Sequence, residues 1–598
     1  MAEKPRIISA PPKITSHSGP KAAMPASATV SEAGTLQKAM SKVLREGRLT
    51  RPGFSGAWVN LEFPRNAEEI HRYTVEGARV RLFKSNESGD LVYHLVPEEY
   101  MLPKYQTRML VEVQRELAGN LPDGAHLLKP ANLREAMTAS AIDVLARRAA
   151  SAVPGVSKDQ EAVTARKLAH ILVTYSVGLG VLEPLLRDPN VQDVYVDAPA
   201  EENPVHVTLG KLPVEAGSGK CATNITLSEE EAQGLLARFR MQSGRPFSEA
   251  MPVLETDLEE LSTRVTVIGK PLSPSGVAMA LRRHATDPWT LPKFVQNRNV
   301  SQLAAGLLWF LIDGRSTMLV AGSRGAGKTS LLGAMMLELP REQRILTIED
   351  TLELPCPEMQ RLGYKVQSLY VRSAIGGTSE LGADDALRVS LRLGESAIVL
   401  GEVRGQETRT LYEAMRSGSA GSAVLGTIHG NSPRSVFERI VYDLGIPAKA
   451  FNATDIVVIS GLIRPGGGKG YVRRVTSIAE VAKEGGKEGE FNELLAYDPQ
   501  SDGLAPTDIY MNRSERIRAI AEQWGMSYKE ALGNIQARGE IKAALCTAAQ
   551  RTGRKDFLSA SWNARANARY WELVEGMKGA DNAALVGSWR AWFDRLAA

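Results

Sequence analysis

The stretch VAGSRGAGKTSLL, residues 320–332, decides the fold of this chain. Its glycines, lysine and threonine follow the spacing G-x-x-x-x-G-K-[ST], in which the backbone N–H groups of a glycine-rich loop surround phosphate groups. An apolar, β-branched run precedes the loop, and SLLGAMMLEL after it favours a helix whose N-terminus adds partial positive charge. A flexible turn with an accidental lysine would not explain both flanks. The stretch therefore predicts a strand–loop–helix unit that binds ATP or GTP, with Lys328 bridging the β- and γ-phosphates and Thr329 holding Mg²⁺.

From about residue 297 onwards, short apolar strands alternate with helical segments. The strand-like stretches are TMLVAG, RILTIED, SAIVLGEV, SAVLGTIH and DIVVISG. This alternation is typical of a largely parallel sheet with helices on both faces. We therefore expect an α/β domain over residues 297–500, with a glycine hairpin at GGGKGYVRRV near the sheet edge and a turn or linker at AKEGGKEGE.

Three of these strands end in side chains suited to phosphate chemistry, and the carboxyl ends of parallel strands face the ligand crevice. Glu402 follows a glycine at the end of one strand, and its expected role is to orient Mg²⁺-bound water or the attacking water. Glu349 and Asp350 end a second strand. Glu349 is a candidate general base, although such a cluster also caps a following segment. His429 ends a third strand, where a phosphate-sensing role and a structural role are both open.

Composition bounds the remaining possibilities. The length of 598 residues suggests three or four domains, at roughly 150 residues each. The net charge is only +4, from 72 basic and 68 acidic residues, whereas nucleic-acid-binding domains tend to be strongly basic. Three cysteines lie far apart without a CxxC pair, which excludes a zinc ribbon and suits a reducing compartment. The longest apolar runs fall short of the ~20 residues of a membrane helix, so membrane attachment is expected through a partner.

The rest of the chain divides into four expected regions: a disordered tail at 1–30, an N-terminal α+β region at 31–155, an α+β domain with an antiparallel sheet at 156–296, and a helical C-terminal extension at 501–598. A capping box is expected at Ser527 and Glu530. Five of the eight tryptophans lie in the extension. They fit either a docking module for a partner or helices that pack on their own domain.

Four motifs, in this order, resemble those of the type II/IV secretion ATPase superfamily. GSRGAGKTS resembles its Walker A loop, TIEDTLEL its Asp box, VLGEVRGQET its atypical Walker B motif and GTIHGNSP its His box. The stretch from GEVRGQET to GTIHGNSP is similar to the archaeal branch, which includes motors for assembly of type IV pili and archaella. The resemblance covers about residues 160–500.

This resemblance implies a PAS-like N-terminal domain at 156–296 followed by a RecA-like P-loop motor domain, assembled as a homohexamer with ATP and Mg²⁺ between the two domains. Arginines of the N-terminal domain reach the phosphates in the family, and Arg264, Arg282 and Arg283 resemble that set, with ordinary salt bridges as the alternative. The expected catalytic residues are Glu402, Glu349, Lys328, Arg264 and Arg282. The expected nucleotide contacts are Gly322, Ser323, Arg324, Gly325, Ala326, Gly327, Lys328, Thr329, Ser330, Arg283 and His429. The expected Mg²⁺ ligands, partly through water, are Thr329, Glu402 and Asp350.

The motifs depart from the family pattern in places. Ser323 and Arg324 replace the Pro-Thr of many relatives, Gly405 stands where bacterial relatives usually have Asp, and the four-cysteine metal site of the bacterial branches is absent. The expected function is a cytoplasmic ATPase, attached to the membrane through a polytopic platform protein, that drives assembly of a pilus-like or archaellum filament from pilin-like subunits, or secretion. A conjugation-type secretion ATPase is the close alternative. A DNA-handling RecA-like ATPase is a more distant one, and no direct nucleic-acid partner is expected.

Overall fold

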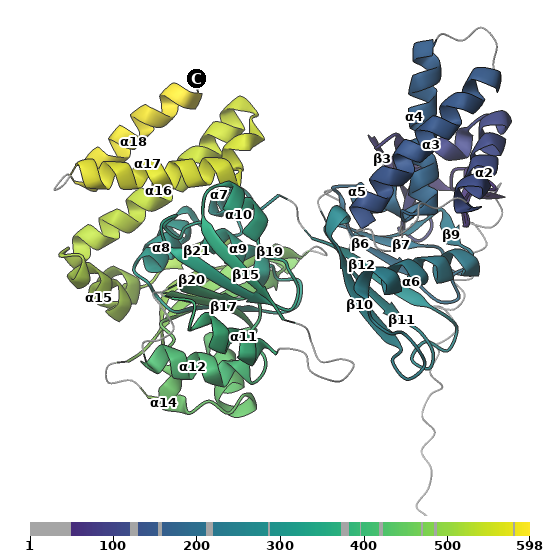
Figure 1. Cartoon of the computed structure of the whole chain (residues 1–598). Coiled ribbons are helices and arrows are strands. Elements are labelled where there is room, and N and C mark those ends of the chain that lie inside the picture. The colour runs from purple at the N-terminus through teal and green to yellow at the C-terminus, as the bar shows by residue number, and fades with distance from the viewer. Residues whose placement is uncertain are drawn as a thin grey trace, which may run out of the picture.

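The computed structural model describes residues 49–598 except for residues 120–129, 153–157, 211–218, 285–286, 372–381, 395, 418–422, 468–470, 484–486, 578–580 and 598. The tail expected at 1–30 lies outside the described residues. Figure 1 shows two bodies of secondary structure: an N-terminal body that ends with strand β12, and a second body that carries the C-terminal helices on one side.

The N-terminal body is built on a nine-stranded sheet in the order β10-β11-β12-β6-β7-β8-β5-β4-β3. Its strands are β3 (Ala67–Val75), β4 (Ala78–Ser85), β5 (Leu91–Val96), β6 (Val191–Val196), β7 (His206–Leu209), β8 (Lys220–Thr223), β10 (Val253–Leu258), β11 (Thr263–Ile268) and β12 (Ala278–Arg283). Neighbouring strands are antiparallel except β5 and β8, which pair in parallel. A three-stranded sheet contains β1 (Leu49–Thr50), β2 (Ala57–Asn60) and β9 (Ile225–Leu227).

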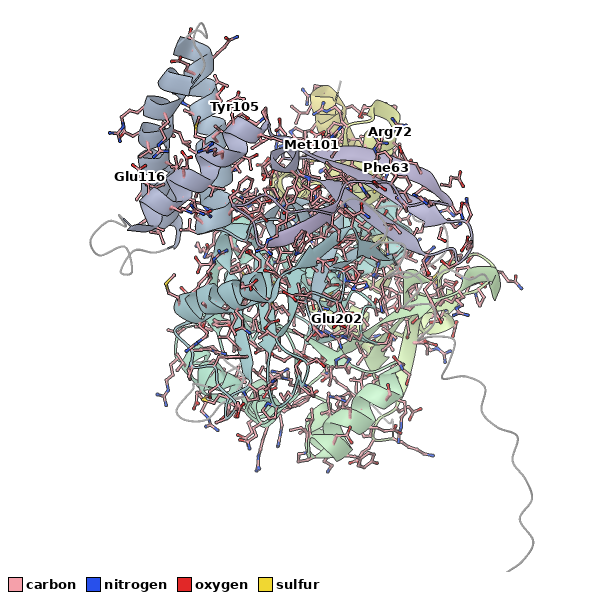
Figure 2. All side chains as sticks on the ribbon, turned by 90° about the vertical axis from the view of Figure 1, so that its right-hand side faces the viewer. Phe63, Arg72, Met101, Tyr105, Glu116 and Glu202 are labelled. Carbon is pink, nitrogen blue, oxygen red and sulfur yellow. The ribbon has the colours of Figure 1, made fainter. Side chains whose placement is uncertain are left out.

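The helices of this body are α2 (Lys104–Gly119), α3 (Pro130–Ala152), α4 (Lys158–Ser176), α5 (Leu182–Arg187) and α6 (Glu229–Ser243). Figure 2 shows α2, with Tyr105 and Glu116 labelled, beside the other long helices at one end of the body. A single hydrophobic core runs from Phe54 to Leu281. The expected boundary at residue 155 therefore does not separate two units, because β5 pairs with β8 and both sides of the boundary share one core.

The second body contains a nine-stranded sheet in the order β15-β14-β16-β17-β13-β18-β19-β20-β21. Its strands are β13 (Met318–Gly322), β14 (Arg344–Glu349), β15 (Lys365–Tyr370), β16 (Ala397–Leu400), β17 (Ala423–His429), β18 (Ile456–Ile463), β19 (Val472–Val481), β20 (Phe491–Asp498) and β21 (Gly503–Pro506). The first six strands in spatial order are parallel and the last three continue the sheet antiparallel. The largely parallel sheet predicted from the sequence is confirmed. This sheet extends past the expected domain boundary at residue 500, since β21 pairs with β20.

Both faces of this sheet are buried, which explains why its strands are apolar throughout. Side chains of β13 alternate between two cores: Met318 and Val320 belong to one, Leu319 and Ala321 to the other. The helices of this body are α7 (Leu291–Gln296), α8 (Gln302–Asp313), α9 (Lys328–Met336), α10 (Cys356–Arg361), α11 (Ala383–Ser390), α12 (Glu407–Ser417), α13 (Pro433–Glu438) and α14 (Ala448–Phe451).

The C-terminal helices α15 (Glu515–Gln523), α16 (Tyr528–Thr552), α17 (Ala560–Gly576) and α18 (Asn582–Ala597) lie against the second body (Figure 1). Helix α16 begins at the predicted capping box of Ser527 and Glu530. Where α16 meets α8, the two backbones touch: a Cβ on Gly306 would lie 2.1 Å from the carbonyl oxygen of Ile535, and one on Gly539 would lie 2.5 Å from that of Gln302. Only glycine allows this approach, so α16 is packed as part of the second body.

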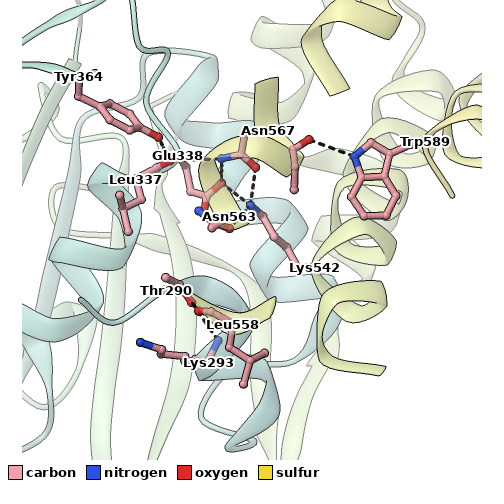
Figure 3. A network of polar contacts seen from close by, with 11 residues as sticks. Thr290, Lys293, Leu337, Glu338, Tyr364, Lys542, Leu558, Asn563, Asn567 and Trp589 are labelled. Carbon is pink, nitrogen blue, oxygen red and sulfur yellow. Dashed lines mark hydrogen bonds and ion pairs between the residues drawn. The ribbon is translucent and has the colours of Figure 1, made fainter. Parts of the chain in front are cut away.

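A buried ion pair joins helix α16 to Glu338, the second residue after the end of α9 (Figure 3). Lys542 Nζ, which is fully buried, lies 2.6 Å from Glu338 Oε2 and donates to Asn563 Oδ1 and Asn567 Oδ1 at 2.7 Å each. The two asparagines in turn donate to the Glu338 carboxylate. Every polar group of the pair is thus satisfied, as a buried charge requires.

The five C-terminal tryptophans all serve hydrophobic cores. Trp562 and Trp589 are buried, and Trp524, Trp571 and Trp592 are half-buried and pack against core clusters. This arrangement confirms the interpretation that the helices pack on their own domain. Among the described helices, none combines the length and apolar character that crossing a membrane requires.

We expect Glu338→Leu to destabilise the second body by about 3–5 kcal/mol, because it leaves the Lys542 ammonium buried without a counter-charge. The measurement is the midpoint of urea unfolding followed by tryptophan fluorescence. The double variant Glu338→Leu/Lys542→Met should recover most of the loss, and Arg590→Ala, which removes a largely exposed pair with Glu540, should change little. An unchanged midpoint for Glu338→Leu alone would contradict this account.

Candidate functional site

The glycine-rich loop runs from the end of β13 to the start of α9. Gly325 and Gly327 have positive φ angles of +80° and +89°, conformations that favour glycine. Gly327 is also the residue that precedes the first turn of α9, so the free N–H groups of the helix start at Lys328. The loop between the end of β13 and the start of α9 thus has the backbone geometry expected of a phosphate-binding turn.

Strands β18 and β19 brace this loop from the side opposite the acidic residues of the site. A Cβ on Gly322 would lie 2.2 Å from the Ser460 carbonyl oxygen, so only glycine fits there. The Ser460 hydroxyl donates to the Ala326 carbonyl at 2.7 Å, and Arg473 Nε donates to the Gly325 carbonyl at 2.8 Å. Sequence reasoning missed Ser460 and Arg473, because their proximity follows from the order of strands in the sheet.

Lys328, His429 and Glu402 form a chain of contacts across three strand ends. Lys328 Nζ lies 3.5 Å from His429 Nδ1, and His429 Nε2 lies 3.1 Å from Glu402 Oε1. An ammonium only donates and a carboxylate only accepts, so the arrangement suits a histidine that carries its proton on Nε2 and accepts on Nδ1. The register of the sheet explains the contact, since Gly322 of β13 is the Cα partner of His429 of β17.

The Lys328 ammonium is held partly out of solvent. Burial lowers its pKa, while the carboxylates of Glu402 and Glu353 raise it. Its one further hydrogen bond among the described residues goes to the Ser323 carbonyl at 3.2 Å. The other expected loop residues lie at the surface of the turn: Ser323, Thr329 and Ser330 are half-buried and Arg324 is exposed.

Glu349 is buried at the end of β14, with 2% of its surface exposed. One carboxylate oxygen accepts the backbone N–H groups of Glu353 and Leu354 at 2.9 Å each, so the carboxylate also caps the following turn. Burial raises the pKa of Glu349 to about 7. A Cβ on Gly401 would lie 3.1 Å from Glu349 Cγ, which explains why glycine stands immediately before Glu402.

Arg404 connects the acidic residues of two strand ends. Its guanidinium lies 2.5 Å from the Asp350 carboxylate and 3.9 Å from that of Glu402. Sequence reasoning did not single out Arg404, although its position two residues after Glu402 was a signal. Asp350 is therefore engaged in an ion pair. No group of three or more His, Cys, Asp and Glu side chains suited to a metal ion occurs among the described residues. Mg²⁺ bound with a nucleotide needs only one or two carboxylates besides phosphate oxygens, so Thr329 and Glu402 fit such a site.

The three arginines expected to reach the phosphates, Arg264, Arg282 and Arg283, point in two directions. Arg264 and Arg282 are Cα partners on β11 and β12 and so share one face of the sheet. Arg264 Nη1 donates to the Asp350 carbonyl at 3.2 Å and Nη2 lies 3.1 Å from Glu255, which brings Arg264 to the edge of the second body. Arg282 is paired with Asp193 at 2.8 Å within its own body.

Arg283 departs from its expected role. Side chains of neighbouring residues in a strand lie on opposite faces, so Arg283 is turned away from Arg264 and Arg282. Its guanidinium donates to the Asp188 carbonyl at 2.5 Å and the Val191 carbonyl at 3.2 Å. In this structure Arg283 therefore fixes the loop before β6 and does not contact the glycine-rich loop.

A second contact joins the two bodies near Glu349. Tyr370, at the end of β15, donates its hydroxyl to Asp257 of β10 at 3.2 Å. His284 Nε2 lies 3.9 Å from the other oxygen of Asp257. The N-terminal body thus meets the second body at the edge that carries the acidic residues.

Several known proteins are similar to this chain. A family model described as "Type II/IV secretion system protein" matches residues 224–484. An uncharacterized protein of Methanocaldococcus jannaschii is 28% identical over 364 residues, which is 60% of each chain. A "Putative conjugal transfer protein" of Mycobacterium tuberculosis is 30% identical over 276 residues, which is 45% of this chain and 74% of the relative.

Among solved structures, the VirB11 ATPase of the Brucella suis type IV secretion system, crystallised with sulphate, matches 50% of this chain and 94% of its own at 23% identity and a TM-score of 0.24. The family model and the aligned relatives carry the assignment, and residues 224–484, which the family model matches, include the four motifs described above. This chain belongs to the type II/IV secretion system ATPase superfamily.

Proposed function

We propose that this chain hydrolyses ATP at the glycine-rich loop and that hydrolysis drives a secretion or filament-assembly machinery through a membrane partner. The chain of contacts from Lys328 through His429 to Glu402 carries this proposal. It places a cation for the phosphates after β13 and a carboxylate for water after β16, linked by the imidazole at the end of β17, the strand between them. A site that only bound nucleotide would not need the carboxylate.

The residues divide the chemistry between them. Backbone N–H groups of the loop and the Lys328 ammonium bind the phosphates, and Glu402 orients the attacking water. Mg²⁺ held by Thr329, with Glu402 or Asp350 through water, would neutralise phosphate charge. Glu349, with its pKa near 7, is the group best poised to accept the proton of that water, because its free oxygen is not tied to the turn that follows β14.

The N-terminal body completes the site in this proposal. Arg264 already reaches the Asp350 carbonyl, and Arg282 lies beside it on the same face. A guanidinium fork placed at the phosphates stabilises the charge that develops during transfer. We propose that the N-terminal body, which ends with β12, acts as the PAS-like domain and the second body as the RecA-like motor domain of a homohexamer, whose two bodies close on each nucleotide.

A conjugation-type secretion ATPase is a second candidate, and the relative named as a conjugal transfer protein favours it. Assembly of a pilus-like or archaellum filament is supported by the archaeal character of the Walker B and His box motifs. Both candidates place the chain in the cytoplasm, attached to the membrane through a polytopic platform protein. Crosslinking in cells that captures a pilin platform protein or a conjugation channel component distinguishes the two.

We expect Lys328→Ala to lower ATP turnover at least about 100-fold, because the ammonium at the phosphates is lost, while folding is kept since alanine suits a helix start. Turnover is measured by phosphate release and folding by circular dichroism. Lys449→Ala, which changes an exposed lysine of α14, is the matched control. A folded Lys328→Ala protein with normal ATP turnover would contradict the proposal.

The raised pKa of Glu349 gives the turnover rate a pH dependence. A general base must be deprotonated, so kcat should rise as pH passes about 7 and be about tenfold below its plateau near pH 6. Glu349→Gln should lower kcat by about 100-fold or more and remove the rising limb. A Glu349→Gln enzyme that keeps the same limb assigns the titration to another group.

The two directions of the arginines predict opposite effects. Arg264→Gln should lower kcat with little change in the unfolding temperature, because its guanidinium lies at the edge of the second body. Arg283→Gln should leave kcat within about twofold and instead destabilise the N-terminal body by about 1.5–3 kcal/mol, since two hydrogen bonds from a charged group are lost. Steady-state kinetics and thermal unfolding measure both. A loss of kcat in a stable Arg283→Gln protein would reverse the assignment.

A further inference from the structure

A groove of about 980 Å³ lies between the second body and the C-terminal helices. Its walls come from the end of α8, the segment before β14, the start of β15 and helices α15, α16 and α17. Arg344 and Lys365, on this rim, are Cα partners at the first residues of β14 and β15. Glu349 of the candidate site lies at the opposite end of β14, roughly 17 Å away at ~3.4 Å per residue. The groove is therefore separate from the nucleotide site.

The rim of the groove carries an excess of positive charge. Arg315, Arg344 and Lys365 are exposed on it, and Glu342 is the exposed acid among the described lining residues. Asp313 also lines the groove but is already paired with Arg538 at 2.8 Å. The chain as a whole is nearly neutral, at +4 over 598 residues. The groove is thus locally basic, which favours a ligand that carries negative charge.

The floor of the groove is aromatic. Trp524, Tyr570 and Trp571 line it, and the guanidinium of Arg538 lies 5.8, 5.0 and 5.0 Å from the centroids of their rings. The two tryptophans are half-buried, so part of each ring faces the groove. Such rings provide apolar contact area and stacking partners at a low cost in side-chain entropy.

The Nη1 nitrogen of Arg538 has no geometrically normal hydrogen bond. Nη2 bonds Asp313 and Nε donates to Asn534 Oδ1 at 2.7 Å, whereas Nη1, with its two N–H groups, is buried beside the Tyr570 ring and has no such partner in the described part of the chain. The side chain is only 1% exposed. Buried donors are nearly always paired in folded proteins, and an unpaired one costs free energy. A ligand acceptor that reaches the floor would satisfy it.

We propose that this groove binds an acidic segment of a partner protein that carries an aromatic side chain. Carboxylates of the segment pair with Arg344 and Lys365, and its ring packs on Trp571 and Trp524. The volume lies at the upper end of the range for binding sites and accommodates several side chains. A membrane surface fits less well, because the rings lie in a concave site rather than on an exposed face. The family model ends at residue 484, so helices α15, α16 and α17 of the groove lie outside the matched region.

The test is panning of a phage-displayed library of random peptides, each about a dozen residues long, on the full-length protein. Counter-selection uses the charge-reversed variant Arg344→Glu/Lys365→Glu. Peptides that require the groove are expected to be rich in Asp and Glu and to contain Trp, Tyr or Phe. Synthetic copies are then measured by fluorescence anisotropy at low and high salt, where binding should weaken as salt rises.

Matched variants separate binding from folding. The variants Arg344→Glu/Lys365→Glu and Trp571→Leu should each lower the affinity for the synthetic peptide about tenfold or more. The control Arg72→Glu/Arg409→Glu reverses two exposed arginines away from the groove and should stay within about twofold. Circular dichroism and ATP turnover should match the unmodified protein in all three, since none of these residues belongs to the nucleotide site.

Three results would overturn the proposal. The first is panning that yields no peptide able to discriminate the unmodified protein from Arg344→Glu/Lys365→Glu. The second is discriminating peptides without an excess of acidic residues. The third is binding of vesicles made of equal parts phosphatidylglycerol and phosphatidylcholine that depends on the groove while peptides do not bind, which would assign the groove to a membrane surface. The variant Lys328→Ala tests ATP hydrolysis alone, because a loss of ATP turnover changes none of these three binding results. The proposed function and the groove proposal can therefore fail independently.

Discussion

The tight turn after β13 constrains everything around it. Gly322 ends the strand and has parallel neighbours on both sides, with His429 of β17 and Ser460 of β18 as its Cα partners. The Ser460 carbonyl leaves no space for a side chain at Gly322, and the Ser460 hydroxyl fixes the loop at Ala326. One residue thus aligns the imidazole of the site on one side and the support of the loop on the other. A change in strand order would displace both.

The functional strand ends could be read from the sequence because each carries its polar residue directly after an apolar run. Glu349, Glu402 and His429 follow from this pattern and Lys328 from the spacing of the glycine-rich loop, and all four lie at one sheet edge. Residues such as Ser460 and Arg473 could not be found, because they sit on strands whose neighbours are chosen by the whole sheet. Arg282 and Arg283, however, are neighbours on one strand, and the side chains of neighbouring strand residues lie on opposite faces. The sequence alone therefore predicts that these two arginines do not reach the same ligand.

The N-terminal body was the part of the fold that local pattern described least well. Its separate strands and helices were recognisable, but the parallel pairing of β5 with β8 joins residues 91–93 to residues 221–223, with helices α2, α3, α4 and α5 between them. No local signal reports a contact over that separation. The same long-range pairing builds a single core, so the sheet that carries Arg264 is supported by residues from the first third of the chain. The edge that meets Asp350 is therefore held by a larger body than the motif region alone.

Helix α9 has a consequence at its far end. It starts at the phosphate loop with Lys328, and two residues after its last turn Glu338 forms the buried pair with Lys542 of α16. Neither charge can leave the other without standing alone in a dry interior. The helix is short, roughly 14 Å at ~1.5 Å per residue, and stiff. One short helix therefore begins in the glycine-rich loop and ends next to a buried ion pair with α16, so the loop and the C-terminal helices are anchored to its two ends.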